Sequence, residues 1–312
     1  MAADAFYFEA RDGARLFVRR WLPEGRVRAI VQIVHGLAEH SGRYQDFAEA
    51  LNRAGVGAYE GDLRGHGRSA EGGALGFFAP KEGWRRCLDD LADLNRHVAS
   101  VHPATPIILF GHSMGSFLAQ NFVAERGDRL AGAIFSGSNG RPPAIAALGR
   151  LIARIERLRL GPKGKSALLK SMWFGAFNKP FEPARTVFDW LSRDPAAVDA
   201  YVADPLCGFD FTTQLAVDVL DALPSMLAPE NVARIPTSLP ILIVSGSRDP
   251  VGPNIENLVE TYRKAGLHPK LRLYPDGRHE MLNEINREAV KADIVGWIGG
   301  VIEKTEPIAA SA

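Results

Sequence analysis

Residues 107–116 read Ile107-Ile108-Leu109-Phe110-Gly111-His112-Ser113-Met114-Gly115-Ser116. The apolar run leads into a G-x-S-x-G motif, and the helical pattern of Met114–Glu125 follows. A serine on a strained turn between a strand and a helix is typical of a nucleophile, because the turn lifts its hydroxyl clear of the sheet. Side chains at Gly111 and Gly115 would clash with the neighbouring strand and helix. We therefore predict Ser113 as the nucleophile, with His112 in the supporting turn. The flanking strand and helix disfavour the alternative, a Gly-Ser loop without chemistry.

Outside this motif, short apolar strands alternate with amphipathic helices. A hairpin of Ala5–Ala10 and Ala14–Trp21 is expected first. The further strands expected are Ala29–Val34, Val56–Glu60, Ile107–Phe110, Ala131–Phe135, Leu239–Ser245 and Lys270–Tyr274. The helices expected between and after them are Tyr44–Ala54, Glu82–Val101, Met114–Glu125, Asn254–Ala265 and Glu284–Ile302. Near-continuous apolar strands separated by helices predict an α/β fold with a mostly parallel central sheet and helices on both faces.

The alternation is interrupted once. From Gly140 to about Arg234 the pattern is helical, irregular and broken by many prolines. An interruption of this length between two strands predicts an inserted helical cap over the strand ends. We expect residues 1–139 and 235–312 to form the catalytic domain, residues 140–234 the cap, and residues 305–312 a frayed tail.

A serine hydroxyl needs a general base, and in this architecture the order along the chain is serine, acid, histidine. The histidines that follow Ser113 are His268 and His279. His268 precedes the last strand and so lies at the wrong end of the sheet, whereas His279 follows that strand. Asp249 follows the preceding apolar strand and is predicted to orient His279. Asp276 is the rival acid, but it is so near His279 in sequence that we expect it in the turn.

An oxyanion hole needs two N–H donors. One is predicted to be the backbone N–H of Met114, directly after the nucleophile. The second is predicted in the loop after Ala29–Val34, where Gly36 permits a backbone turn and the N–H of Leu37 is the donor. His35 is interpreted as a positioning residue rather than a catalyst.

These segments together resemble the α/β-hydrolase superfamily. His35-Gly36-Leu37-Ala38-Glu39-His40-Ser41-Gly42-Arg43-Tyr44 and His279-Glu280-Met281-Leu282-Asn283-Glu284 are similar to the monoacylglycerol lipase and lysophospholipase branch, which includes proteins described as serine aminopeptidases. The resemblance implies the α/β-hydrolase fold, a triad of Ser113, Asp249 and His279, and an oxyanion hole of Leu37 and Met114. One departure is Ser116, where the family usually has a further glycine. Serine is small, so we expect it to be tolerated.

Other chemistries lack their signals. The glycine-containing segment Asp62–Ser69 lacks the Gly-Lys-Ser/Thr ending of a phosphate loop and is interpreted as a structural turn. Asn283 stands where a second histidine would complete a zinc motif with His279 and Glu280. We expect no metal and no cofactor. The net charge of +1 gives no footprint for nucleic acid.

The two cysteines, Cys87 and Cys207, are far apart and are interpreted as free buried thiols. The first residues lack the basic region and apolar run of a signal peptide. We therefore expect a cytoplasmic protein.

One segment is strongly basic. Between Arg141 and Lys170 there are eight Lys or Arg and one acidic residue, a charge of +7 that leaves −6 for the rest of the chain. Apolar residues recur there at helical spacing, with arginines on the opposite face: Ile145, Leu148, Leu151, Ile152, Ile155 and Leu158 against Arg150, Arg154 and Arg157. Such a helix at about 145–159 can lie on an anionic membrane surface. Alternatively, its apolar face packs on the catalytic domain and its arginines are solvated.

Together, these features predict a serine hydrolase that cleaves a lipid monoester, a monoacylglycerol or a lysophospholipid, through an acyl-enzyme. Aromatic residues of the cap are candidates for an acyl pocket. Two alternatives stay open: an amidase, thioesterase or acyltransferase with the same triad, and a non-catalytic ligand receptor. The intact triad argues against the receptor.

Overall fold

The computed structural model describes residues 4–140 and 146–305. Its centre is an eight-stranded sheet in the order β1-β2-β4-β3-β5-β6-β7-β8. The strands are β1 (Asp4–Glu9), β2 (Arg15–Trp21), β3 (Ala29–Val34), β4 (Val56–Gly61), β5 (Ile107–His112), β6 (Gly132–Ser136), β7 (Ile241–Gly246) and β8 (Lys270–Tyr274). β1 and β2 form the predicted hairpin and pair antiparallel, as do β2 and β4, whereas all pairs from β4 to β8 are parallel.

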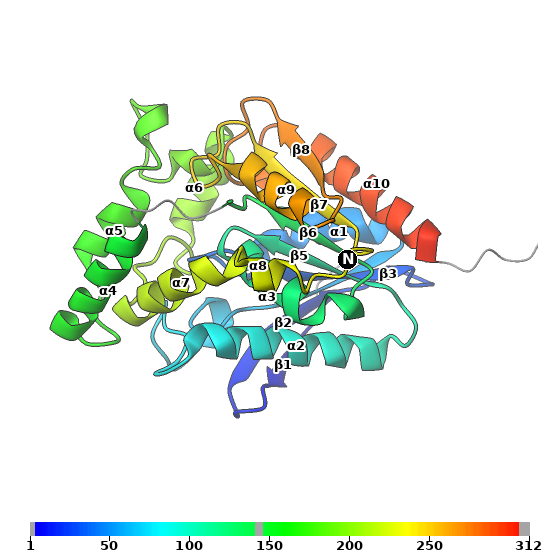
Figure 1. Cartoon of the computed structure of the whole chain (residues 1–312), viewed down its shortest axis with the longest axis horizontal. Helices are drawn as coiled ribbons and strands as arrows, with labels where there is room; N and C mark the ends of the chain where they lie inside the picture. The colour runs from blue at the N-terminus through cyan, green and yellow to red at the C-terminus, as the bar shows by residue number, and fades with distance from the viewer. Residues whose placement is uncertain (1–3, 141–145, 306–312) are drawn as a thin grey trace, which may run out of the picture.

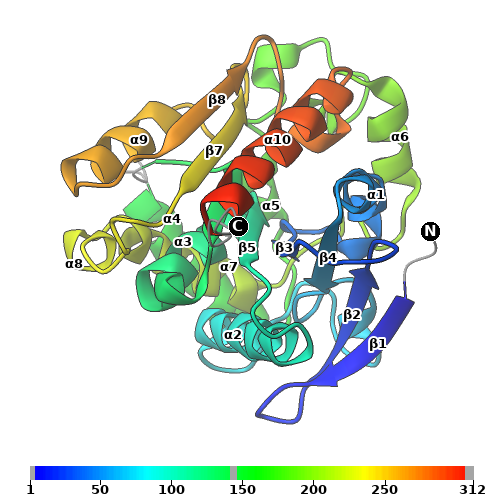
Figure 2. The same ribbon diagram turned by 90° about the vertical axis from the view of Figure 1, so that its right-hand side faces the viewer.

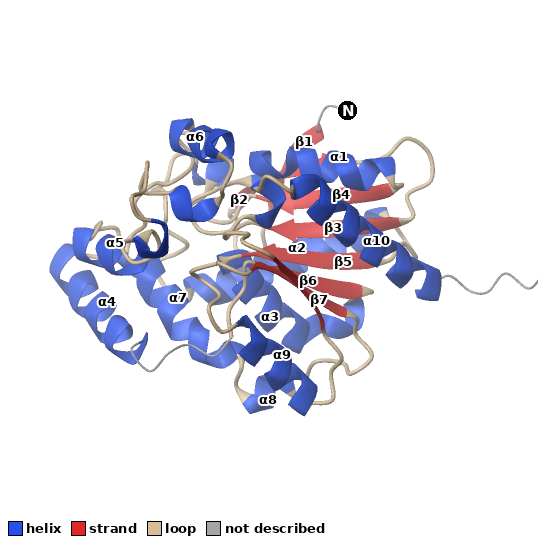
Figure 3. Cartoon of the chain, turned by 90° about the horizontal axis from the view of Figure 1, so that it is seen from above, coloured by secondary structure: helices blue, strands red, loops and turns tan. Residues whose placement is uncertain are grey.

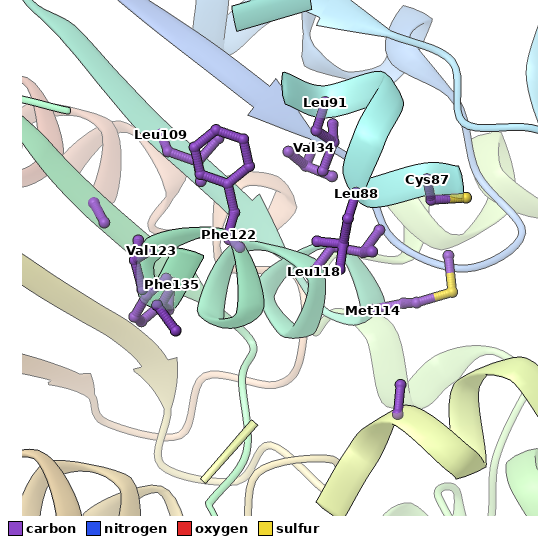
Figure 4. Packing of buried hydrophobic residues seen from close by; sticks show 14 of the residues in the cluster. Val34, Cys87, Leu88, Leu91, Leu109, Met114, Leu118, Phe122, Val123 and Phe135 are labelled. Atoms are coloured by element: carbon purple, nitrogen blue, oxygen red, sulfur yellow. The ribbon is translucent and has the colours of Figure 1, made fainter. Parts of the chain in front are cut away.

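Helices cover both faces of the sheet, as predicted (Figure 2). One face is covered by α1 (Gln45–Arg53) and α10 (Arg287–Thr305), whose buried residues pack with those of β3 and β7. The other face is covered by α2 (Gly83–Val101), α3 (Met114–Arg126) and α9 (Ile255–Lys264). In Figure 4, Phe122 of α3 lies against Leu109 of β5, and Leu118 lies against Leu88 of α2. Burial of these side chains anchors the helix that begins directly after Ser113.

Between the neighbouring strands β6 and β7 the chain is helical. This segment contains α4 (Ala146–Leu160), α5 (Ala167–Phe174), α6 (Pro195–Ala203), α7 (Thr213–Met226) and α8 (Pro229–Val232). Figures 1 and 3 show α4, α5 and α6 gathered beyond one end of the strands, the end that also carries the loop with Ser113. However, α7 and α8 contact α3 and share its apolar core. The division into a cap and a catalytic domain therefore stays a prediction.

The helix α4 turns most of its large apolar residues toward solvent, not toward the protein. Leu148, Leu151, Ile155 and Leu158 are exposed, with fractions between 52% and 83%. The arginine side faces α7, where Arg154 bonds Asp221 and Arg157 bonds Gln214. The expected packing of the apolar face is therefore wrong for these four residues, whereas Ile152 of the same face packs against the core. The expected solvation of the arginines holds for Arg154, whose side chain is 60% exposed. Ile145 lies outside the described residues, as does the tail after Thr305.

Within the described ranges, we find no helix with the length and apolarity needed to cross a bilayer. Both cysteines are free and buried, as expected.

Candidate active site

The nucleophile turn has the strained geometry that the motif predicts. Ser113 stands between β5 and α3 with φ of 52° and ψ of −122°, a left-handed conformation that is unfavourable for a side-chain-bearing residue. A Cβ on Gly115 would lie 2.1 Å from the carbonyl oxygen of Val34, and one on Gly111 would lie 2.5 Å from the carbonyl oxygen of Gly115. The predicted lack of space at both glycines is therefore confirmed.

Ser116 fits where the family usually has glycine. Its hydroxyl donates to the carbonyl oxygen of Ser113 at 2.6 Å and lies 2.8 Å from the hydroxyl of Ser138. Ser138 also accepts a hydrogen bond from the side chain of Gln120. The buried hydroxyl is therefore satisfied, which explains how the turn accommodates it.

The loop after β3 passes directly beside the nucleophile. A Cβ on Gly36 would lie 3.1 Å from the Cβ of Ser113, so only a glycine lets the two segments approach this closely. The His35 ring lies with Nδ1 2.8 Å from the carbonyl oxygen of Gly36, and its Nε2 accepts the N–H of Leu63. Both ring nitrogens are thus used in fixing the loop. Leu37 and Met114, the predicted oxyanion donors, line the same cavity as Ser113.

The predicted acid and base meet at the carboxyl end of the sheet. Nδ1 of His279 lies 3.0 Å from both carboxylate oxygens of Asp249, and the two side chains are buried. An Nδ1–H donated to Asp249 leaves the lone pair on Nε2, where a general base needs it. Burial by itself lowers the pKa of His279, but the charge of Asp249 and its hydrogen bond outweigh burial and hold the pKa above its ordinary value. His279 and Ser113 line one cavity.

The rival residues lie elsewhere. Asp276 is exposed in the turn after β8, with φ of 56°, and His268 is exposed before that strand. His268 does not line the cavity with Ser113, and it is Asp249 that bonds Nδ1 of His279.

Aromatic rings pack around the base. The rings of His112 and Trp190 lie 4.8 Å and 5.0 Å from that of His279. Burial, and then the neighbouring His279, lower the pKa of His112 to about 4, which keeps its ring neutral. A Cβ on Gly137 would lie 2.9 Å from both the His112 and His279 rings, so this glycine makes room for them. Sequence reasoning missed Gly137 and Trp190, because neither belongs to a motif.

One cavity contains Ser113, and a second cavity shares part of its wall. The smaller, of about 60 Å³, holds Ser113, His279 and the oxyanion loop. The larger, of about 340 Å³, is lined mainly by apolar side chains from α5, α7 and the loop after β7. The two share the lining residues Phe117, Trp173, Phe177, Val219 and Val251. An apolar chamber therefore lies next to the chamber that holds the nucleophile.

Known proteins share this arrangement. A family model described as "Serine aminopeptidase, S33" matches residues 25–286. The chain belongs to this family. The monoacylglycerol lipase of Mycolicibacterium smegmatis is 27% identical to it over 299 residues, which cover 93% of this chain and 95% of the relative. Human monoglyceride lipase is 28% identical over 248 residues, with coverage of 76% and 71%.

Among solved structures, a thermostable carboxyl esterase from Bacillus coagulans in complex with glycerol has a TM-score of 0.89 and 29% identity, covering 97% of this chain and 99% of that one. The expected α/β-hydrolase fold and the resemblance to the monoacylglycerol lipase branch are thereby confirmed. The chain is a hydrolase, similar over most of its length to hydrolases of carboxylic esters.

One group of side chains in this hydrolase has the composition of a metal site. His40, Asp204 and Cys207 each bring a possible ligand atom within 4.8 Å of the others. However, Nδ1 of His40 accepts the N–H of Gly42, and its Nε2 lies 2.8 Å from a carboxylate oxygen of Asp204. A metal ion on Nε2 would leave the ring proton on Nδ1, which would then face the N–H of Gly42 instead of accepting its hydrogen bond. The group is better described as a hydrogen-bonded contact between the loop after α6 and His40, which directly follows the loop after β3.

Charged residues without a predicted role also surround the site. Glu39 accepts the N–H of Gly36, and Arg43 bonds both Glu39 and Glu280. The available signals were the i, i+4 spacing of Glu39 and Arg43 and the position of Glu280 next to His279. Neither signal specifies a partner, because the bond from Arg43 to Glu280 spans 237 residues.

Proposed function

We propose that this protein hydrolyses carboxylic esters of lipid monoesters through an acyl-enzyme on Ser113. The observation that carries the proposal is the buried His279, which lines one chamber with Ser113 and whose Nδ1 lies 3.0 Å from both carboxylate oxygens of Asp249. His279 removes the proton of Ser113 as the hydroxyl attacks the ester carbonyl, and then protonates the leaving alcohol. The N–H groups of Leu37 and Met114 stabilise the oxyanion, and water releases the acid by the same route.

Two further observations favour a lipid substrate. The apolar chamber next to the nucleophile suits an acyl chain, because small-molecule sites bind apolar groups largely by burial. Similar proteins are described as monoacylglycerol lipase and monoglyceride lipase. Together these suggest that the acyl chain occupies the larger cavity while the alcohol portion faces the polar residues near His279.

Initial rates on p-nitrophenyl esters of increasing chain length test the proposal, with Ser113→Ala alongside. We expect a preference for medium or long chains and loss of activity in the variant. Monoacylglycerol and lysophosphatidylcholine of the same chain length then distinguish the head groups. Full activity of Ser113→Ala would contradict the proposal, as would failure of the wild type to hydrolyse any ester.

Amide hydrolysis is the second candidate, because the family description names an aminopeptidase. An aminopeptidase needs an acidic group to bind the substrate's α-ammonium. The carboxylates that line the small cavity are Glu39 and Glu280, and both are already paired with Arg43. We therefore expect aminoacyl p-nitroanilides to be hydrolysed far more slowly than esters, and the reverse order would favour the peptidase.

We also infer that α4 docks on an anionic lipid surface. Its exposed stripe (Leu148, Leu151, Ile155 and Leu158) lies in the basic segment, while Ala146 and Gly149 of the same helix line the apolar cavity. An amphipathic helix with basic neighbours binds lipid through both apolar burial and charge. The docked helix would place the cavity next to the membrane that holds the substrate.

Co-sedimentation with vesicles of phosphatidylcholine and phosphatidylglycerol tests this contact. Leu151→Gln combined with Ile155→Gln should weaken binding, whereas Ile285→Gln, an equally exposed apolar residue before α10, should not. Rates on a short soluble ester should stay unchanged. Equal binding by all three proteins would contradict docking through α4, and a dimer that the double variant abolishes would assign the stripe to self-association instead.

A further inference from the structure

One arginine joins two loops of the active site that lie far apart in the sequence. The oxyanion loop (residues 35–39) follows β3, and the base loop (residues 278–284) follows β8. Arg43 donates to Glu39 at 2.7 Å and, through two nitrogens, to both carboxylate oxygens of Glu280 at 2.6 Å. The planar guanidinium suits this bidentate geometry, which fixes orientation as well as distance.

Both ends of this bridge are attached to segments next to the predicted reacting residues. On one side, Glu39 accepts the N–H of Gly36 at 2.6 Å and the hydroxyl of Tyr44 at 3.0 Å. Gly36 is the residue that lies against Ser113 and precedes the predicted donor Leu37. On the other side, Glu280 follows His279 directly and is held a second time by the side chain of Asn283.

The bridge is buried and carries an unbalanced charge. The side chains of Glu39, Arg43 and Glu280 are 4%, 12% and 6% exposed. Two carboxylates share one guanidinium, so the three groups together carry one negative charge. Burying an uncompensated charge is costly, and an apolar replacement often serves stability as well. The extra carboxylate therefore calls for an explanation other than stability.

This net negative charge lies near His279, whose ring becomes positively charged in the proposed reaction. Two carboxylates near His279 come from other loops: Asp249 from the loop after β7 and Glu39 from the oxyanion loop. Glu280 lies beside His279 in the base loop, and the neutral ring of His112 comes from β5. The uncharged ring of Trp190 packs on it as well. When His279 takes the proton of Ser113 it becomes an imidazolium, which nearby carboxylates stabilise.

We propose that Glu280 and Arg43 are positioning residues: Glu280, held by Arg43, stabilises the protonated form of His279, and Arg43 keeps the oxyanion loop in register with the base loop. This rests on the proposed function, since it assigns His279 the part of general base. The electrostatics agree, because burial opposes protonation of His279 while Asp249, then Glu280 and Glu39, raise its pKa. Burial raises the pKa of Glu280, but Arg43 outweighs it and keeps this carboxyl ionised.

Glu280→Gln tests the electrostatic part, because it removes the charge and nearly preserves the shape. Two rates are measured against pH: kcat/KM on a p-nitrophenyl ester, and labelling of Ser113 by a fluorophosphonate, which needs no ester substrate. A lost negative charge lowers the pKa of His279, so the acid limb of both profiles should move to lower pH by about 0.5 to 1 unit. The plateau of kcat should fall by about 3- to 10-fold with KM nearly unchanged.

Two matched variants separate charge from geometry. Glu280→Asp keeps the charge but shortens the reach to Arg43, so kcat should fall while the acid limb stays within about 0.2 units of the wild type. Glu284→Gln removes another buried carboxylate of the same loop, one that bonds Arg193 and the backbone N–H of Arg278. This control should leave the acid limb in place. If Glu280→Gln does not fold, Glu39→Gln replaces it with the same expected shift.

An acid limb that stays in place in Glu280→Gln, or that moves equally in Glu284→Gln, overturns the inference. A kcat that is unchanged in Glu280→Asp overturns the coupling of the two loops. The proposed function fails separately, through an active Ser113→Ala or through a wild type that the fluorophosphonate does not label.

Discussion

Asp249 offers both carboxylate oxygens to one nitrogen of His279, each at 3.0 Å, and also accepts the N–H of Val251. An asparagine at this position keeps the shape but presents an amide that disfavours the tautomer with its proton on Nδ1. We therefore expect Asp249→Asn to fold normally and to lose about 10³- to 10⁴-fold in kcat. Ester hydrolysis and circular dichroism measure the two effects. The matched control is Asp276→Asn, an exposed carboxylate in the turn after β8, which should keep wild-type activity.

The pH dependence of the wild type follows from the same pair. As the proposed general base, His279 must be neutral to act, so kcat/KM should fall as the pH drops through the pKa of this ring. Since Asp249 raises that pKa despite burial, the midpoint should lie above the ordinary histidine value of about 6.5. In Asp249→Asn the raising charge is gone while burial remains, so the residual activity should titrate at lower pH. A wild-type midpoint below about 6 would contradict this assignment.

The residues that the sequence could specify share one property. Ser113, Asp249 and His279 each follow a strand of the parallel sheet, so strand patterns alone place them at the same edge. The positions of Trp190 and Arg43 in the site could not be predicted from the sequence. Their contacts with the base loop depend on how segments with no shared periodicity fold back on one another, and no local pattern records that.

At the scale of elements, the junction of β5 and α3 depends on Gly115. A methyl group there would meet the carbonyl oxygens of Val34 and His35 at 2.1 Å and 2.4 Å, and backbone atoms cannot move aside as a flexible side chain can. We expect Gly115→Ala to destabilise the fold by about 2 to 3 kcal/mol and to reduce activity. Gly296→Ala in α10 is the control. It meets no atom within 4 Å, so it should be neutral or stabilising by up to about 1 kcal/mol. Urea unfolding compares the two, and equal stability would contradict the argument.

The orientation of α4 shows what periodicity leaves open. The spacing of its leucines and isoleucines identified an apolar face, but a face can turn toward the protein or away from it. Here the opposite side carries the buried Ala153 and Glu156, and two arginines bond α7. Small size, specific polar partners and the apolar contact of Ile152 together hold the buried side, and most of the large apolar residues face away from it.

For the whole molecule, segments from the helical insertion reach both catalytic loops. Tyr201 of α6 and the N–H of Gly208 donate to the carbonyl oxygen of Ala38 in the oxyanion loop. Leu191 accepts the N–H of Glu280 at 2.8 Å in the base loop. The mostly parallel sheet followed from the alternation of strands and helices, whereas these contacts of the insertion with the two loops did not. The insertion held in this way also forms part of the wall of both chambers, to which α5 contributes Trp173.

The residues that line both chambers come from α3, α5 and the segment after it, α7 and the loop after β7, so we expect several elements of the fold to determine chain-length selectivity. Val219 of α7 is buried and lines both the small chamber with Ser113 and the apolar chamber of about 340 Å³. Val219→Phe adds side-chain volume at this shared wall. If the acyl chain occupies the larger chamber, hydrolysis of long p-nitrophenyl esters should fall by about 10-fold or more, while acetate hydrolysis stays within about 3-fold of the wild type. A chain-length profile that keeps its shape would place the acyl chain elsewhere, because filling the chamber that holds the chain must slow long esters more than short ones.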